Sequence, residues 1–106
     1  MKWLAAMVLG VALITPAQAD DRVKVCIAIG DTAEVVMKGR QAGMPLSQML
    51  GFVPDGALGP VMREMILMAY SDYTQMHGER LRQMKVDRFR DQWLAACLQN
   101  ARGDLM

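Results

Sequence analysis

The strongest constraint on the fold is a single pair of cysteines, Cys26 and Cys97, placed near opposite ends of a chain of 106 residues. A disulfide between them would bring distant segments together, because the Cα atoms of bridged cysteines lie within about 7 Å of each other. An even cysteine count without a CxxC pair favours a structural bridge over a redox site or a zinc knuckle. The compartment decides whether the bridge forms, since disulfides persist where conditions are oxidising.

The first 19 residues show the pattern of a secretory signal peptide. Lys2 supplies a positive charge, an apolar run extends from Leu4 to Ile14, and Ala17-Gln18-Ala19 has the small residues that a signal peptidase accepts. The run has about 11 residues, whereas a transmembrane helix needs about 20. We therefore expect residues 1–19 to be removed on export, no membrane span in what remains, and a periplasmic or secreted protein.

Export makes the Cys26–Cys97 disulfide the expected state of both thiols. Removal of 19 of the 106 residues leaves 87, which we expect to form one domain, residues 20–106. A domain of this size buries only about 60 to 65% of the surface that its unfolded chain exposes. A bridge that closes a loop of about 70 residues would stabilise it by roughly 4 kcal/mol in the chain-entropy model. Reduction should therefore loosen the domain.

The mature chain has no net formal charge. The full sequence has 12 Lys and Arg against 11 Asp and Glu, and Lys2 leaves with the signal peptide. A neutral chain has no global field that would attract nucleic acid or anionic lipid, so we expect no nucleic-acid partner.

One stretch of the chain is nevertheless locally basic. Between residues 79 and 90 the only acids are Glu79 and Asp87, and the cations are Arg80, Arg82, Lys85, Arg88 and Arg90. This stretch is either a solvated helix face with its preceding loop or a docking patch for an acidic partner or a phosphate-bearing surface. The candidate partner-binding residues are Arg82, Lys85 and Arg88.

Helical periodicity runs through the mature chain, and no segment alternates as a strand would. From Val23 to Ala42, apolar and small residues recur at helical spacing, and Gly43 followed by Pro45 supplies the stop. Arg40, one turn from that end, should extend along the apolar side or bond the last carbonyls of its own helix. A short helical turn is expected over Ser47 to Leu50.

Two further helices follow. Gly59-Pro60 starts the first of them, with proline at a position where its missing N–H is not needed, and we expect it to end between Tyr73 and Gly78. Extending the apolar stripe of the last helix backwards would place Arg82 and Lys85 on the apolar face, so we expect this helix to begin near Val86 or Asp87. The stripe consists of Val86, Phe89, Trp93, Ala96 and Cys97.

These patterns predict an all-α fold, a small domain of three to four helices. Cys26 lies early in the first helix and Cys97 late in the last, both on apolar faces, so a disulfide between them requires these two helices to run antiparallel. The middle helix should close the core. Met62, Ile66 and Tyr70 would then meet Ala33, Met37, Phe89 and Trp93.

The residues offer little support for catalysis, and we expect neither an enzyme nor a bound cofactor. The single histidine, His77, falls in an expected turn, and the only serines are Ser47 and Ser71, so a serine triad would have to be assembled from unrelated loops. The acids that might pair for glycoside cleavage are scattered, and the glycines match no common phosphate motif.

Methionine is abundant and supports an alternative function. Met62, Met65 and Met68 space three thioethers along one helix, and thioethers select Cu(I). Steps of three residues fall about 60° short of a full turn, so Met62 and Met68 are about 120° apart around the helix. Methionine also fills irregular small cores. We therefore prefer core packing and keep a Cu(I) site at these three residues as the alternative.

Some apolar residues fall outside the expected core stripes. Leu67, Met68 and Leu94 lie off the stripes, and Met49 and Phe52 lie in a glycine-rich connection. They either cover a core that is too small to hide everything or form an adaptable contact surface, since Met-rich surfaces repack around different partners. The second interpretation suits a small exported binding module, such as an inhibitor of an envelope enzyme or a holdase.

Three parts of the sequence resemble small exported bacterial proteins of unknown function: Cys26, Arg40-Gln41-x-Gly43 at the end of the first helix, and Phe89-x-x-x-Trp93-x-x-x-Cys97. With a tyrosine-bearing middle helix, the resemblance covers most of the mature chain. It implies a fold and assigns no catalytic or binding residue. We therefore expect a non-enzymatic module that binds a protein partner in the envelope or outside the cell, with Cu(I) binding as the alternative.

Overall fold

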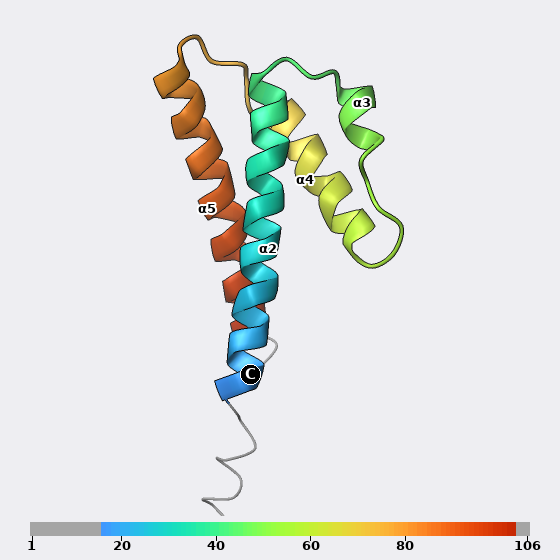
Figure 1. Ribbon diagram of the computed structural model, residues 1–106, viewed down its shortest axis with the longest axis vertical. Coiled ribbons are helices and arrows are strands. Elements are labelled where there is room, and N and C mark those ends of the chain that lie inside the picture. The colour runs from blue at the N-terminus through green and yellow to red at the C-terminus, as the bar shows by residue number, and fades with distance from the viewer. Residues whose placement is uncertain (1–15, 104–106) are drawn as a thin grey trace, which may run out of the picture.

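The computed structural model describes residues 16–103, and the side chains of residues 21–100. This part of the chain consists of four helices without strands, in the order α2 (Pro16–Gln41), α3 (Leu46–Leu50), α4 (Leu58–Asp72) and α5 (Glu79–Gly103). The long helices α2 and α5 lie side by side and run antiparallel, while α4 and the short α3 pack near the end of α2 that is remote from the chain termini (Figure 1). The predicted all-α fold is confirmed. Among residues 16–103, no helix combines the length and apolarity needed to cross a membrane.

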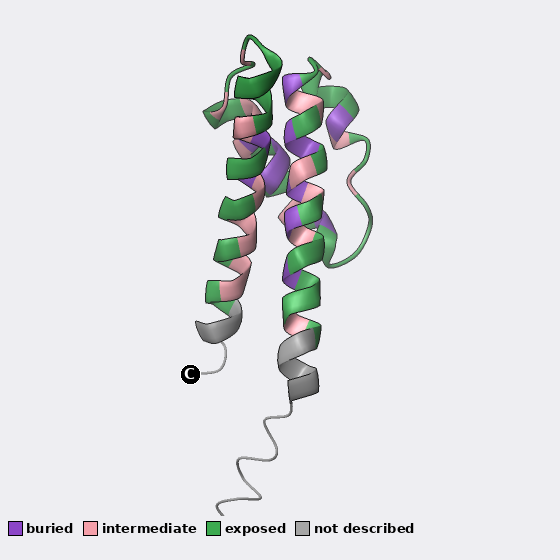
Figure 2. Cartoon of the chain, turned by 60° about the vertical axis from the view of Figure 1, so that its left-hand side comes forward, coloured by how far each residue is buried: buried purple, intermediate pink, exposed green. Residues whose placement is uncertain are grey.

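The core lies where α4 meets α2 and α5, and buried side chains become sparse toward the chain termini (Figure 2). Phe89 packs edge to face with two other rings, at centroid distances of 5.2 Å from Tyr73 and 6.2 Å from Trp93, which is a favourable aromatic arrangement. The predicted packing of the middle helix against the first helix is confirmed, and residues of α4 share the buried core with Val86 and Phe89 of α5. The fully buried apolar residues of the core are Ala33, Val36 and Met37 from α2, Met49 from α3, Met65, Ile66 and Ala69 from α4, and Val86 and Phe89 from α5.

One disulfide joins the two long helices. Cys26 and Cys97 are bonded, with their Cα atoms 5.4 Å apart and a sequence separation of 71. The bridge connects the N-terminal half of α2 to the C-terminal half of α5, which is possible because the helices are antiparallel. Both the predicted bridge and the predicted helix direction are confirmed.

Helix α5 begins at Glu79, well before the predicted start near Val86. The prediction was wrong because it treated Arg82 and Lys85 as too polar for the apolar side of a helix. Arg82 Nε donates a hydrogen bond to the Met76 carbonyl oxygen at 3.0 Å, and Lys85 Nζ lies 5.8 Å from the centre of the Tyr73 ring. Long basic side chains can line an apolar face while their charged ends reach polar or aromatic groups.

Helix α2 ends at Gln41, next to the predicted end at Ala42, but it begins at Pro16, seven residues before the predicted start at Val23. Helix α4 ends at Asp72, just before the predicted range, and Tyr73 has an extended conformation. The predicted cleavage site after Ala19 lies in the first turn of α2. Residues 1–15 of the predicted signal peptide lie outside the described residues.

Candidate functional site

Gln41 binds the connection between α4 and α5 to the end of α2. Its side chain is only 3% exposed. Its Nε2 donates to the Thr74 carbonyl oxygen at 2.9 Å, and its Oε1 accepts from the Met76 backbone N–H at 2.7 Å. One side-chain amide thus satisfies a donor and an acceptor of a segment without secondary structure. Gln41 therefore has a structural role.

Arg40, the neighbouring residue, serves the same connection. Of the two placements expected for Arg40, it does not bond the last carbonyls of its own helix and instead extends along the apolar side: its Nε donates to the Tyr73 carbonyl oxygen at 3.1 Å, and its guanidinium lies 5.0 Å from the centre of the Tyr70 ring. Tyr70 donates its hydroxyl to the Met44 carbonyl oxygen at 2.6 Å. Burial raises the pKa of Tyr70, and the charge of Arg40 opposes this shift. The Arg40-Gln41 pair that carries the sequence resemblance thus holds the fold together.

The three predicted partner-binding residues do not form one cluster. Steps of three residues place Arg82 and Arg88 about 120° apart around α5. Arg82 is tied to the Met76 carbonyl oxygen, and Lys85 lies over the Tyr73 ring. Arg88 is exposed and has no acidic partner among residues 21–100. Lys85 lies between the other two around the helix, about 60° from each, and Arg82 is directed to the Met76 carbonyl oxygen.

Lys85 and Arg88 belong to a face of α5 that we call the basic face, defined by Leu81, Lys85, Arg88 and Gln92. These positions follow the i, i+4, i+7, i+11 spacing of one helix face. Leu81 is 41% exposed, and Gln92 Oε1 accepts a hydrogen bond from the Tyr73 hydroxyl at 2.6 Å. The basic face thus combines an exposed apolar residue with two cations.

The three methionines of the predicted Cu(I) alternative point to different places. Met65 is buried in the core, and it lines a small cavity together with Met62. Met68 lies next to α5, where its sulfur accepts a hydrogen bond from Gln92 Nε2 at 3.6 Å. The geometry brings two of the thioethers to one cavity and directs the third elsewhere. The Cu(I) alternative stays a prediction.

The residues considered for catalysis are not brought together. His77 is exposed in the connection between α4 and α5, and the Ser71 hydroxyl donates to the Leu67 carbonyl oxygen of its own helix at 2.7 Å. Within the described part of the chain, no three His, Cys, Asp or Glu side chains cluster closely enough to hold a metal ion.

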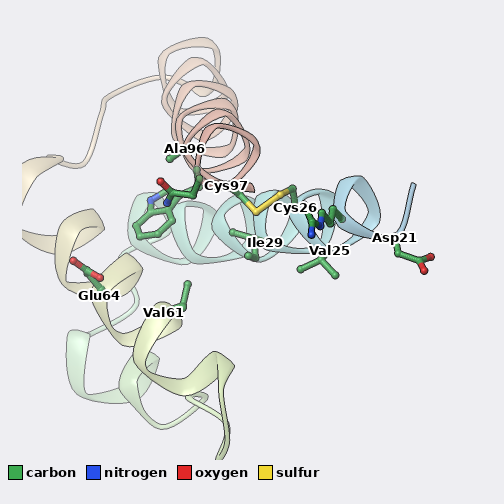
Figure 3. A pocket seen from close by; sticks show the side chains of 11 residues that line it. Asp21, Val25, Cys26, Ile29, Val61, Glu64, Ala96 and Cys97 are labelled. Atoms are coloured by element: carbon green, nitrogen blue, oxygen red, sulfur yellow. A yellow bond between two sulfur atoms is a disulfide. The ribbon is translucent and has the colours of Figure 1, made fainter. Parts of the chain in front are cut away.

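A groove that the sequence analysis missed lies at the disulfide end of the molecule (Figure 3). It consists of two adjoining cavities of about 450 and 240 Å³, which share Val25, Ile29 and Val61. The larger cavity lies beside the disulfide, and the smaller one extends between α2 and the start of α4. We call this pair of cavities the disulfide-end groove. Its remaining lining is Asp21, Arg22, Cys26, Glu64, Trp93, Ala96, Cys97 and Asn100 in the larger cavity and Ala28, Thr32, Pro54, Leu58, Met62 and Met65 in the smaller one.

The groove exists because α4 does not cover this end of α2 and α5. Ala96, predicted as part of the apolar stripe of α5, is exposed, and Trp93 and Cys97 are half-buried. The prediction that no segment alternates was wrong, and the signal for the groove lay there: β-branched apolar residues occupy alternate positions from Val23 to Ile29. Alternate positions cannot all face one core in a helix of 3.6 residues per turn. The pattern therefore requires apolar groups on more than one side of α2.

Comparisons with known protein families, with curated proteins and with solved structures each find no match to this chain. The candidate sites are therefore assessed from the chain's own residues.

Proposed function

We propose that this chain is an exported, non-enzymatic binding module that contacts an acidic protein partner through the basic face of α5. The observation that carries the proposal is the pairing of exposed Leu81 with Lys85 and Arg88 on one helix face. Protein interfaces are enriched in arginine and aromatic side chains, which often lie near their centre beside apolar groups that exclude water. An acidic surface would supply negative charges that can pair with Lys85 and Arg88.

Ion pairing elsewhere supports the choice of this face. Lys38 pairs with Glu34 at 3.2 Å, and Arg90 pairs with Asp31 at 3.3 Å. No described acid pairs with Arg88 in this way. A cation that is neutralised within its own chain attracts an acidic partner less than one that is not.

The Tyr73 side chain prepares the face for binding. Lys85 Nζ lies over its ring, and its hydroxyl donates to Gln92. Side chains that are already ordered lose less conformational entropy when a partner arrives. The basic face is thus partly pre-organised.

The disulfide supports the export part of the proposal. Bridges of this kind form and persist in oxidising compartments, and Cys26 and Cys97 are bonded. The proposed location is the periplasm or the exterior of the cell.

The test is affinity capture from the exported protein fraction of the producing cells, with matched charge variants as bait. The variant Lys85→Glu/Arg88→Glu should lose a partner that the unmodified protein retains at low salt and releases at high salt, because contacts between charges are screened by salt. The control is Lys24→Glu/Arg63→Glu, which makes the same change in net charge at two exposed residues outside the basic face.

Retention of the partner by the control and its loss from the first variant support the proposal. Equal capture by both variants would refute it. Binding of the unmodified protein to vesicles of anionic lipid, with no captured protein, would replace the acidic protein by a phosphate-bearing surface and would also refute it.

A further inference from the structure

The smaller cavity of the disulfide-end groove is lined almost entirely by hydrocarbon. Among the residues that the structure describes, its only polar side chain is that of Thr32, and the Thr32 hydroxyl already donates to the Ala28 carbonyl oxygen at 2.8 Å. A sugar, a nucleotide or a peptide backbone would lose hydrogen bonds to water in this cavity without gaining side-chain partners. The part of a ligand that fills the smaller cavity is therefore hydrocarbon.

The larger cavity continues the smaller one and adds polar residues. Val25, Ile29 and Val61 line both cavities, so the two form one elongated groove. Asp21 and Glu64 lie on opposite sides of the larger cavity, and both are exposed (Figure 3). A groove with one apolar end and one end that carries polar residues fits an elongated amphiphile, with its tail in the smaller cavity.

The dimensions of the groove suit a small ligand better than a protein. Its exposed lining is concave, and its area falls short of what each side of a stable protein interface buries. Small-molecule sites are concave, mostly apolar and commonly about 300 to 1,000 Å³ in volume, and the cavities of about 450 and 240 Å³ together lie in this range. Met62 and Met65 line the smaller cavity, and flexible thioether side chains adapt to the shape of what they contact.

We propose that the disulfide-end groove binds the hydrocarbon chain of a single-chain lipid whose headgroup is uncharged or zwitterionic. The chain extends from the larger cavity past Val25 and Val61 into the smaller one, and the head stays at the larger cavity in contact with water. The carboxylates of Asp21 and Glu64 oppose an anionic head, and a mature chain without net formal charge does not attract one. The basic face lies toward the opposite end of α5, so the lipid site is independent of the acidic partner.

Titration of the oxidised mature protein with alkylphosphocholines of increasing chain length, each kept below its micelle-forming concentration, tests the proposal. Calorimetry measures the dissociation constant. Trp93 lines the larger cavity and is the only tryptophan of residues 20–106, so its fluorescence reports whether the chain enters the groove. We expect one site, with a dissociation constant that falls about 2- to 4-fold for each added methylene group and stops falling once the chain fills both cavities.

A matched pair of variants locates the chain. Ala28→Phe adds a ring at the smaller cavity and should weaken binding of the longest alkylphosphocholine about 10-fold, because the ring takes the place of the last methylene groups. The control is Ala95→Phe, the same substitution at an exposed alanine of α5 that lines neither cavity. It should bind like the unmodified protein, and circular dichroism should show unchanged helicity in both variants.

A second pair uses charge instead of bulk. Val25→Glu places a carboxylate where the two cavities meet and should also weaken binding, whereas Val35→Glu, at a residue that is 64% exposed and lines neither cavity, should not. Absence of saturable binding, binding without a change in Trp93 fluorescence, or equal weakening within either pair of variants would overturn the proposal. Tighter binding of an alkanoate than of the alkylphosphocholine of equal chain length would overturn the choice of headgroup.

Discussion

At the scale of single residues, Gln41 shows how one buried amide fixes a connection that has no regular structure of its own. The segment between α4 and α5 must return the chain to α2, yet its backbone groups lack helical partners. Gln41 supplies both a donor and an acceptor, to Thr74 and Met76. Arg40 adds a hydrogen bond to the Tyr73 carbonyl oxygen. Two adjacent residues thus fix the path of the connection between α4 and α5.

Replacement of this amide should destabilise the fold. Gln41→Leu keeps the apolar bulk but removes both hydrogen bonds and leaves their backbone partners on Thr74 and Met76 without protein partners. The expected loss in the free energy of unfolding is about 2 kcal/mol, or roughly 1 kcal/mol for each bond. Urea unfolding followed by circular dichroism measures it. Gln99→Leu, on an exposed glutamine of α5, is the control, and an equal loss in both variants would contradict the structural role of Gln41.

At the scale of elements, periodicity predicts helix faces better than helix ends. The faces of α2, α4 and α5 follow from apolar spacing, as buried Met37, Ile66 and Phe89 show. The start of α5 was missed because a periodicity argument assigns a whole residue to one side of a helix. Lys85 cannot be assigned to one side, because its aliphatic chain and its charged ammonium group have different surroundings.

The groove could not be predicted from apolar periodicity, for a different reason. It depends on where α4 lies relative to α2 and α5, and side-chain packing sets the angle between helices. The alternate apolar residues from Val23 to Ile29 indicate that α2 needs contacts on more than one side. They do not indicate which element provides them. The disulfide was predictable, because only two cysteines are available to pair.

The start of α5 depends on Gly78. Its φ is +91°, a conformation that residues with a side chain rarely adopt, and its carbonyl oxygen accepts the hydrogen bond from the Arg82 backbone N–H at 3.1 Å. A Cβ added here meets no atom within 4 Å, so only backbone strain opposes a substitution. Gly78→Ala should lower the free energy of unfolding by about 1 to 2 kcal/mol in urea titrations.

Comparison with Gly78→Asn separates backbone strain from other effects of adding a side chain at this position. Asparagine tolerates positive φ better than alanine and suits the residue before a helix. The loss in Gly78→Asn should therefore be clearly smaller than that in Gly78→Ala. Equal losses would show that the positive φ of Gly78 is not what the fold requires.

At the scale of the whole molecule, different interactions stabilise the two ends. The apolar core lies at the end where α4 packs on α2 and α5, and it includes Met37 and Phe89. The other end has the Cys26–Cys97 bridge and few buried side chains (Figure 2). The disulfide thus stabilises a pair of helices where the hydrophobic core does not reach, and that same end carries the groove.

Removal of the bridge should therefore affect the two ends unequally. In Cys26→Ser/Cys97→Ser, the amide hydrogens of residues 21–30 and 93–100 should exchange with solvent much faster than in the oxidised protein, because the bridge no longer restricts how far the two helix ends separate when they open locally. Amides of the core helices, near Ile66 and Phe89, should lose protection only to the extent that global stability falls, by at most about 4 kcal/mol. Hydrogen exchange measured residue by residue distinguishes the two effects.

The variant also separates the disulfide end from the basic face. Since Cys26 and Cys97 lie at the opposite end of α5 from Leu81 and Lys85, opening of the disulfide end should leave the basic face able to keep its partner. Cys26→Ala/Cys97→Ala serves as the control for the polarity of serine and should behave in the same way. A uniform loss of protection along α2, α4 and α5 would mean that the two ends unfold together, and the disulfide would then stabilise the molecule as a single unit.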